Sequence, residues 1–181
     1  MNPTRQEQIL IRLATASDAD QIHTVLFNSF KEFELLYTPQ AFAATVPTAD
    51  QIQARLDEGP TWIALDHKEI VGTVSAVAKE SGIYIRSMAV APSARGKRIG
   101  HKLLETIEDF ASSQALTILF LSTTPFLDRA IKLYENHGFK RSTEGPDDLF
   151  GTPLFTMIKL LPVAPTRHRS QTKAVAKPLS E

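Results

Sequence analysis

The stretch from Gly82 to Ser112 constrains the fold of this chain more than any other. It opens with residues 83–91, a run rich in Ile, Tyr, Met and Val that is typical of a β-strand and is stopped by Pro92. Apolar residues then recur at helical spacing over 99–110, which predicts an amphipathic helix that begins near Arg98 or Ile99. We therefore expect a strand that leads into a helix through a short basic turn.

The turn between this strand and this helix has the features of an anion site. Its residues are Arg95, Gly96, Lys97, Arg98, Ile99 and Gly100. The first N–H groups of a helix lack intrahelical acceptors, and the helix dipole adds partial positive charge at that end. Basic side chains add full charges, and glycine lets a phosphate approach the backbone closely. We expect a phosphate here, although a solvated basic helix start without a ligand has the same local sequence.

The rest of the chain alternates between strand-like and helix-like segments. Apolar runs and alternation predict strands at 9–14, 61–65, 70–78, 116–121, 139–142 and 154–161. Helical spacing predicts helices that start from a cap at Ser17, from a capping box at Thr48 and Gln51, and at Pro125. Residues 31–47 are expected to be irregular because two prolines, at 39 and 47, interrupt any long helix.

Three features predict how neighbouring segments connect. The polar turn at 66–69 favours antiparallel pairing of the strands on either side of it. Gly72, inside the second of these strands, predicts a β-bulge or a close backbone contact. Residues 143–151 are predicted to form a polar loop between the last two strands.

Length and composition limit the class of protein. With 181 residues the chain fits one domain, which we place at 1–161, followed by a disordered basic tail at 162–181. The sequence has no cysteine, which excludes disulfides, thiolate metal sites and a cysteine acyl-enzyme. No metal is expected, because His23 has no second ligand at metal-binding spacing near it.

The charge balance and the hydropathy of the sequence indicate which binding partners and which cellular location to expect. The 20 basic residues balance the 20 acidic ones, and the basic turn has no aromatic stacking platform, so we expect no nucleic-acid binding. There is no signal-peptide core and no apolar run near the length of about 18 residues that a membrane helix needs. We therefore expect a cytoplasmic protein without membrane association. A homodimer is left open.

Two motifs in the chain resemble those of the GCN5-related N-acetyltransferases, the GNAT superfamily. The first family motif, Gln/Arg-x-x-Gly-x-Gly/Ala after a Val-x-Pro sequence, is matched by residues 90–100, with Arg95 in its first place and Gly100 in its last. Arg98 replaces the usual middle glycine. Residues 130–139, AIKLYENHGF, resemble the second motif, A-x-x-L-Y-x-x-x-G-F. Two motifs in the right order are more specific than either alone, and the resemblance covers most of residues 9–161.

The resemblance implies a fold and an activity. The fold is of the α/β (α+β) class, with a mixed, mostly antiparallel sheet and helices on both faces. The activity is direct transfer of acetyl from acetyl-CoA to the primary amine of a small molecule or peptide, in a ternary complex. A non-catalytic acyl-CoA-binding module is the alternative.

The resemblance also assigns the acetyl-CoA site. The strand ending at Met88, Ala89 and Val90 is expected to splay from the strand at 116–121, so that pantetheine inserts and bonds to the freed backbone. The N–H of Val90 is the candidate for polarising the thioester carbonyl, where a fixed donor stabilises the oxyanion that develops. Residues 95–100 are expected to hold the diphosphate.

Proton transfer needs an acid and a base. Tyr134 occupies the place of the family's general acid. Its position on an apolar helix stripe favours core packing when taken alone, and the motif match favours the catalytic role instead. The family often has a Glu near the position of Tyr84, and this chain has none there. Glu32 and Glu34 are possible substitutes, with exposed loop acids as the alternative interpretation. His137 also titrates near neutrality, but its place at a helix end favours a capping role.

Overall fold

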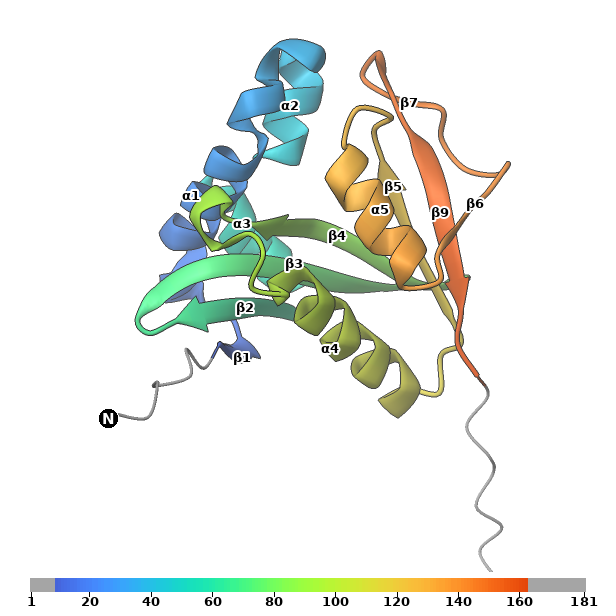
Figure 1. The fold of residues 1–181 in the computed structure, drawn as a ribbon, viewed down its shortest axis with the longest axis horizontal. Coiled ribbons are helices and arrows are strands. Elements are labelled where there is room, and N and C mark those ends of the chain that lie inside the picture. Colours follow the sequence, from blue (N-terminus) through green and yellow to red (C-terminus); the bar gives the residue numbers. More distant parts are fainter. Residues whose placement is uncertain (1–8, 163–181) are drawn as a thin grey trace, which may run out of the picture.

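A computed structural model describes residues 9–162, so the predicted tail lies outside the described residues except for Pro162. Seven strands form one sheet in the order β1–β2–β3–β4–β5–β9–β6 (Figure 1). Their bounds are β1 Leu10–Leu13, β2 Thr61–Asp66, β3 Glu69–Lys79, β4 Gly82–Val90, β5 Ile118–Thr123, β6 Lys140–Arg141 and β9 Phe155–Leu160. Within this described sheet β4 and β5 run parallel, and all other neighbours run antiparallel. The predicted mixed, mostly antiparallel sheet is confirmed.

Helices cover both faces of the sheet, as predicted (Figure 1). α1 (Ala19–Phe30) and α3 (Ala49–Leu56) pack on one face, and α4 (Ile99–Ser113) and α5 (Asp128–Asn136) pack on the other. Successive side chains of a strand point to opposite faces. In β2, Ile63 accordingly joins the apolar cluster of α1 and α3, whereas its neighbour Ala64 joins the cluster of α4 and α5.

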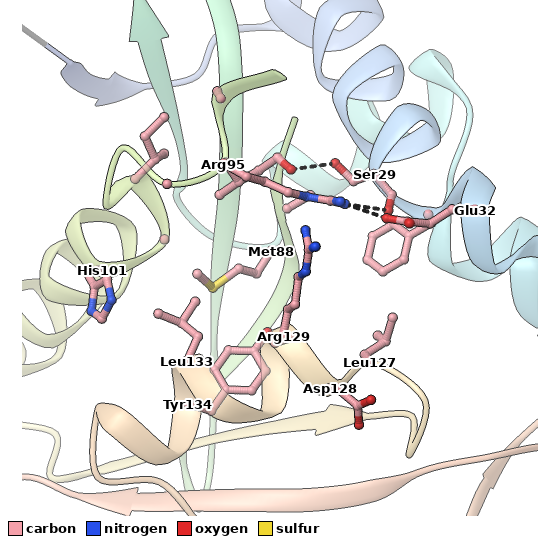
Figure 2. Close-up of a pocket in the computed structure, with 18 of the residues that line it drawn as sticks. Ser29, Glu32, Met88, Arg95, His101, Leu127, Asp128, Arg129, Leu133 and Tyr134 are labelled. Atoms are coloured by element: carbon pink, nitrogen blue, oxygen red, sulfur yellow. Dashed lines mark hydrogen bonds and ion pairs between the residues drawn. The ribbon is translucent and has the colours of Figure 1, made fainter. Parts of the chain in front are cut away.

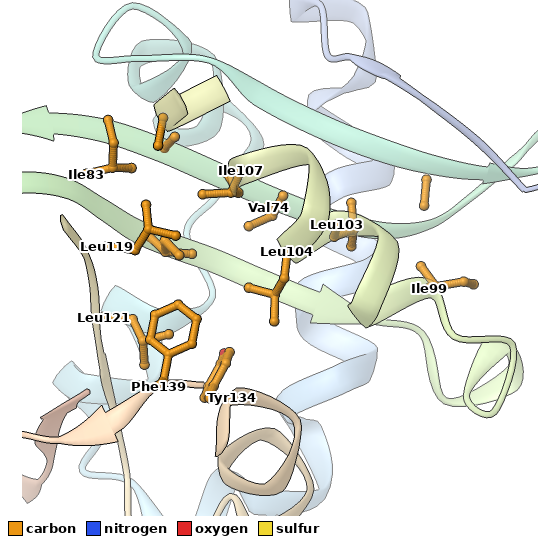
Figure 3. Close-up of a cluster of buried hydrophobic side chains, with 14 of the residues drawn as sticks. Val74, Ile83, Ile99, Leu103, Leu104, Ile107, Leu119, Leu121, Tyr134 and Phe139 are labelled. Atoms are coloured by element: carbon orange, nitrogen blue, oxygen red, sulfur yellow. The ribbon is translucent and has the colours of Figure 1, made fainter. Parts of the chain in front are cut away.

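The predicted apolar stripe fixes α4 to the sheet. Leu103, Leu104 and Ile107 are fully buried, and Figure 3 shows them grouped with Val74 of β3 and Leu119 of β5. Each fully buried aliphatic side chain of this size stabilises the fold by about 1.5–3 kcal/mol. The start of α4, and the basic turn that precedes it, is thereby held in place.

β2 and β3 form the predicted antiparallel hairpin, with His67 and Lys68 in its turn. The register shifts beside Gly72, which confirms the bulge expected there. A Cβ atom at Gly72 would lie 3.0 Å from Cγ2 of Ile99. Glycine at this position therefore lets the first turn of α4 lie close to β3.

The segment between α1 and α3 is more regular than predicted. Residues 31–47 contain the 3-10 helix η2 (Lys31–Leu36) and the helix α2 (Pro39–Thr45). Pro39 occupies the first position of α2, where a missing N–H leaves no intrahelical bond unmade. The hydroxyl of Thr38 caps the helix by accepting a hydrogen bond from the N–H of Ala41 at 3.2 Å.

Two helix starts and one loop also differ from the prediction. Ser17 is not a cap, because it lies inside the 3-10 turn η1 (Ala16–Asp18) and Asp18 directly precedes α1. α5 begins at Asp128 rather than Pro125. The loop at 143–151 contains β7 (Asp148–Leu149), which pairs with β8 (Thr152–Pro153) in a small second sheet. This hairpin is held by hydrogen bonds from Thr38 to Phe150 and Thr152, across the fold.

Candidate active site

The site originates in a gap between β4 and β5. In the described part of the chain these strands pair only through Ile83 with Leu119 and Tyr84 with Phe120. Beyond Tyr84 they diverge, as the sequence analysis expected (Figure 1). The edge of β4 at residues 88–90 is therefore left without a strand partner on that side.

A bulge in β4 accompanies the divergence. Thr73 pairs with Ala89 and Ser75 with Arg86, so β4 has one more residue than β3 over this interval. Ser87 lies in the bulge with φ +51°, a left-handed conformation that costs a residue with a side chain about 1–3 kcal/mol. Bulges bend a strand and increase its twist. This one was not predicted, because serine carries no signal for positive φ.

The divergence opens into a cavity of about 770 Å³ (Figure 2). Eight of the nine predicted cofactor residues line it, namely Met88, Ala89, Val90, Arg95, Gly96, Arg98, Ile99 and Gly100. Glu32 and Tyr134 line it as well. Lys97 and Glu34 are not among the lining residues.

The backbone of the basic turn is shaped for a helix start. Arg98 is the residue before α4 and has φ +57°, and Gly96 has φ +89°. Position 98 is where the family motif has its middle glycine, and the positive φ is the physical reason for that preference. The N–H groups of Ile99, Gly100 and His101 form the first turn of α4, so they have no intrahelical acceptor.

The basic side chains of the turn are anchored to other elements. The guanidinium of Arg95 lies 2.8 Å from a carboxylate oxygen of Glu32 (Figure 2). The ammonium of Lys97 lies 2.8 Å from Asp66 in the β2–β3 hairpin and lowers the pKa of that carboxyl. Lys97 therefore ties the turn to the hairpin, which explains why it does not line the cavity.

Gly100 is required by packing as well as by any ligand. A Cβ atom at this position would lie 2.7 Å from Cδ2 of Leu133 in α5, and 3.7 Å from Cε of Met88. The absence of a side chain lets α4 and α5 approach each other at the cavity. Phosphate binding was the only role predicted for this glycine from the sequence.

The polar groups of Val90 point toward the open side of β4. The N–H of Ala91 bonds to the carbonyl of Val71 in β3, so the backbone groups of Val90, one residue earlier, face the opposite way. The Val90 carbonyl accepts a hydrogen bond from the hydroxyl of Ser29 in α1 at 3.1 Å. Ser29 is a buried residue of the cavity wall that the sequence analysis missed, because no local pattern links α1 to β4.

Tyr134 serves the core and the cavity at once. The centroid of its ring lies 5.9 Å from that of Phe139 within the cluster of α4 and α5. Tyr134 also lines the cavity (Figures 2 and 3). Burial raises the pKa of its hydroxyl well above the usual value near 10. The group therefore stays protonated and is suited to donate a hydrogen bond rather than to release a proton.

The two candidate bases differ in position. Glu32 lies on the cavity wall beside Arg95, with about half of its side chain exposed, whereas Glu34 is exposed on η2 and outside the lining. Phe33 and Phe126, which were not predicted to be site residues, form an aromatic wall of the cavity and stack with their ring centroids 6.1 Å apart. Tyr37, outside the lining, meets Phe126 edge-on with a centroid separation of 4.9 Å. The wall joins η2 to the loop before α5.

No group of three or more His, Asp or Glu side chains in residues 9–162 could hold a metal ion. No helix in the same part of the chain combines the length and the apolar character needed to cross a membrane.

Comparison with known proteins adds independent evidence. The model of the acetyltransferase (GNAT) family matches residues 24–139. The uncharacterized N-acetyltransferase YhfO of Bacillus subtilis strain 168 is 31% identical over 145 residues, covering 74% of this chain and 91% of that protein. The probable N-acetyltransferase camello of Xenopus laevis is 39% identical over 84 residues, and the match spans 45% of this chain and 38% of that protein.

Solved structures share the fold. A GNAT-family acetyltransferase from Staphylococcus aureus Mu50 gives a TM-score of 0.72 at 20% identity, over 86% of this chain and 100% of that chain. The PaiA N-acetyltransferase from Thermoplasma acidophilum, solved in complex with coenzyme A, gives 0.72 at 16% identity, over 84% of this chain and 99% of that chain. The family match over more than half of the sequence, the extended similarity to YhfO and the shared fold agree: the chain belongs to the acetyltransferase (GNAT) family and is an acetyl-CoA-dependent acyltransferase.

Proposed function

We propose that the protein moves the acetyl group of acetyl-CoA directly to a primary amine, with both substrates bound in one ternary complex. The observation that carries the proposal is a single cavity that reaches Val90, Tyr134 and Glu32 together. These residues supply a backbone donor, a hydroxyl donor and a carboxylate. Relatives named as N-acetyltransferases support an amine as the acceptor.

Acetyl-CoA is assigned to the open edge of β4 and the basic turn. The pantetheine arm adds along residues 88–90, where the divergence from β5 leaves backbone groups without a strand partner. The diphosphate lies against residues 95–100, at the N–H groups of the first turn of α4 and near Arg98. Lys97 acts by fixing the turn through Asp66.

The reaction joins the amine nitrogen to the acetyl carbon and breaks the carbon–sulfur bond. The nitrogen attacks the thioester carbonyl, and the N–H of Val90 stabilises the negative charge that develops on its oxygen. As this intermediate collapses, the sulfur leaves with the bonding electrons and accepts a hydrogen bond from Tyr134. The products are the N-acetyl compound and coenzyme A, whose thiolate then takes up a proton from the solvent.

The acceptor amine must lose protons during the reaction. An ammonium with a pKa of about 10.4 costs about 4–5 kcal/mol to deprotonate at pH 7. We assign this proton transfer to Glu32, acting through water, with Arg95 holding the carboxylate at the cavity wall. Glu34, outside the cavity lining, is the second choice for this role.

The first experiment is a product analysis. Incubation of the protein with acetyl-CoA and a panel of amino acids, polyamines, aminoglycosides and peptides should yield at least one product that is heavier by an acetyl group, identified by mass spectrometry. The free thiol of coenzyme A should appear in equal amount. Tight binding of acetyl-CoA without turnover of any amine would instead support the non-catalytic acyl-CoA-binding module.

A second experiment tests the direct transfer. Intact-mass measurement after incubation with acetyl-CoA alone should show no stoichiometric acetylation of the protein, since the chain has no cysteine to carry the acyl group. An acetylated protein that passes its acetyl group to an acceptor would refute the ternary-complex mechanism.

Domain limits and location complete the proposal. We assign the catalytic domain to residues 1–161 and leave the basic tail outside it. The lack of cysteine fits a reducing compartment, which supports a cytoplasmic location.

A further inference from the structure

A guanidinium group enters the cavity from α5. Arg129 is the second residue of this helix and lines the cavity, and Figure 2 shows its side chain extending in the direction of the Arg95–Glu32 ion pair. Within residues 9–162 the side chain of Arg129 donates no hydrogen bond and forms no ion pair. The carboxylate of Asp128 points away from it in the same view. Arg129 therefore brings a positive charge to the cavity that the described part of the protein does not neutralise.

The other arginines of the cavity lining already have a role. Arg95 pairs with Glu32 at 2.8 Å, and Arg98 belongs to the turn that is assigned to the diphosphate. The pantetheine arm, assigned to the edge of β4, carries no charge that Arg129 could balance. A guanidinium presents a rigid fork of N–H donors that matches the two oxygens of a carboxylate. Its charge is therefore available to the second substrate, the acceptor.

The aromatic wall of Phe33 and Phe126 forms a second part of the acceptor end. The two rings belong to η2 and to the loop before α5, and their planes are inclined by 28°. Both residues are only partly buried and both line the cavity, so apolar surface faces the open space. Covering such surface with an apolar group is favourable, and aromatic rings add preferred stacked and edge-on contacts. The wall is suited to an aromatic side chain of the acceptor.

We propose that the acceptor is an aromatic α-amino acid, with its carboxylate bound by Arg129 and its ring against Phe33 and Phe126. Its amine then faces Glu32, the proposed base, and all four residues line the one cavity. This inference rests on the proposed function and keeps its chemistry. The amine nitrogen joins the acetyl carbon as the carbon–sulfur bond breaks, and the product is an N-acetyl amino acid with an unchanged carboxylate.

The charges of the cavity disfavour the other classes of acceptor. A polyamine or an aminoglycoside brings several ammonium groups toward Arg129, and like charges repel. A peptide N-terminus has an amide where the amino acid has its carboxylate, so it leaves the guanidinium without a charged partner. A phosphorylated amine carries nearly two negative charges, which the carboxylates of Glu32 and Asp128 in the same lining disfavour. One carboxylate matches the one available guanidinium.

The first test compares acceptors of the unaltered protein in the presence of acetyl-CoA. The kcat/KM for L-phenylalanine should exceed that for L-phenylalaninamide about 10–100-fold, the usual contribution of a charge-assisted hydrogen bond. L-Alanine keeps the carboxylate and lacks the ring, and its kcat/KM should be lower than that of L-phenylalanine by about tenfold or more. Release of the coenzyme A thiol gives the rates, and mass spectrometry identifies the N-acetyl products.

Arg129→Gln tests the assigned carboxylate contact. It should lower kcat/KM for L-phenylalanine about 10–100-fold and change that for L-phenylalaninamide less than about threefold. The Kd of acetyl-CoA, measured by calorimetry, should stay the same. Lys132→Gln is the matched control, because it removes a cation from an exposed position of the same helix outside the cavity lining. It should leave both acceptors and the Kd unchanged.

Phe33→Ala tests the aromatic wall. It should lower kcat/KM for L-phenylalanine by about tenfold and leave that for L-alanine nearly unchanged, so that the preference between the two disappears. Leu35→Ala is its control, since Leu35 lies in the same 3-10 helix with 99% of its surface exposed and does not line the cavity. This variant should keep the preference for L-phenylalanine.

The outcomes separate this inference from the proposed function. Acetylation of other amines in place of aromatic amino acids, including O-phosphoethanolamine, would overturn the inference and leave acetyl transfer to an amine intact. Equal losses for acid and amide in Arg129→Gln, or a weaker acetyl-CoA Kd with an unchanged preference, would overturn it as well. Turnover of no amine at all would overturn the proposed function. If Arg129→Gln does not fold, the comparison of acid with amide in the unaltered protein still decides.

Discussion

At the scale of single residues, the hydroxyl of Tyr134 is the group on which the proposed departure of the thiolate depends. Tyr134→Phe keeps the ring that packs on Phe139 and removes only the hydrogen-bond donor. Because burial keeps this hydroxyl protonated, its contribution is a hydrogen bond to sulfur, and we expect kcat to fall about 10–100-fold, or about 1.4–2.7 kcal/mol. Steady-state kinetics and the acetyl-CoA Kd, which should change less, measure the effect.

Tyr37→Phe is the control for this substitution. Tyr37 is also a buried tyrosine, and it packs on Phe126 without lining the cavity itself. The Tyr37→Phe variant should be less stable than the unaltered protein, without a specific loss of kcat. Normal turnover in Tyr134→Phe, or a loss that follows the melting temperature in both variants, would return Tyr134 to a purely structural role.

Arg98 offers a second prediction at this scale. Its φ of +57° costs a residue with a side chain about 1–2 kcal/mol, whereas glycine adopts this conformation without strain but loses more entropy on folding. Arg98→Gly should therefore stabilise the protein by about 0.5–1 kcal/mol while weakening acetyl-CoA binding through the lost charge. Urea unfolding and calorimetry measure the two effects. Arg98→Ala, which loses the charge and keeps the strain, should weaken acetyl-CoA binding without stabilising the protein. Equal stability of Arg98→Gly and Arg98→Ala would contradict the strain argument.

At the scale of elements, the start of α1 depends on one ion pair. Both carboxylate oxygens of Asp18 bond to Arg12 of β1, at 2.8 and 2.9 Å, and Asp18 also accepts from the N–H of Thr15. These contacts lower the pKa of Asp18 to about 2, from an unfolded value of about 3.9. The stability that they contribute is present above about pH 4 and is lost as the pH falls toward 2.

Asp18→Asn should therefore cost about 1–2 kcal/mol at pH 7, less than the full linkage value because Arg12 is partly exposed. The difference from the unaltered protein should shrink as the pH falls from 4 to 3. Thermal melts of both proteins from pH 7 to pH 3 give the comparison. Asp20→Asn, an exposed acid in the same helix, should differ from the unaltered protein by less than about 0.5 kcal/mol throughout. A pH-independent difference for Asp18→Asn would refute the linkage.

At the scale of the whole molecule, Leu161 is the last described residue that belongs to the core of the domain. Its N–H bonds to the carbonyl of Thr117, and its side chain belongs to the cluster of α4 and α5. A chain that ends at Leu161 should keep its melting temperature and its affinity for acetyl-CoA. A chain that ends at Leu160 should lose about 1.5–3 kcal/mol through the missing apolar burial. A large loss already on removal of 162–181 would show that the tail docks on the domain.

Much of the fold could be predicted because its determinants are local. The strand–turn–helix at Gly82–Ser112, the hairpin turn at 66–69 and the bulge at Gly72 depend on periodicity and on residues a few positions apart. α2 was missed for a local reason as well, since Pro39 was taken as a helix breaker although it is tolerated at the first helical position.

The sequence by itself determined most of the strands and helices, the basic, glycine-containing character of the turn and the motif position of Tyr134. Tertiary structure alone decided which side chains meet at the cavity. Ser29 reaches the Val90 carbonyl across 61 positions, and His101 reaches His137 across 36. Such contacts leave no periodic signal, because they depend on where the diverging strands and the packed helices bring distant residues together. The gap between β4 and β5 was likewise not readable from local sequence, and the bulge at Ser87 that accompanies it carries no sequence signal.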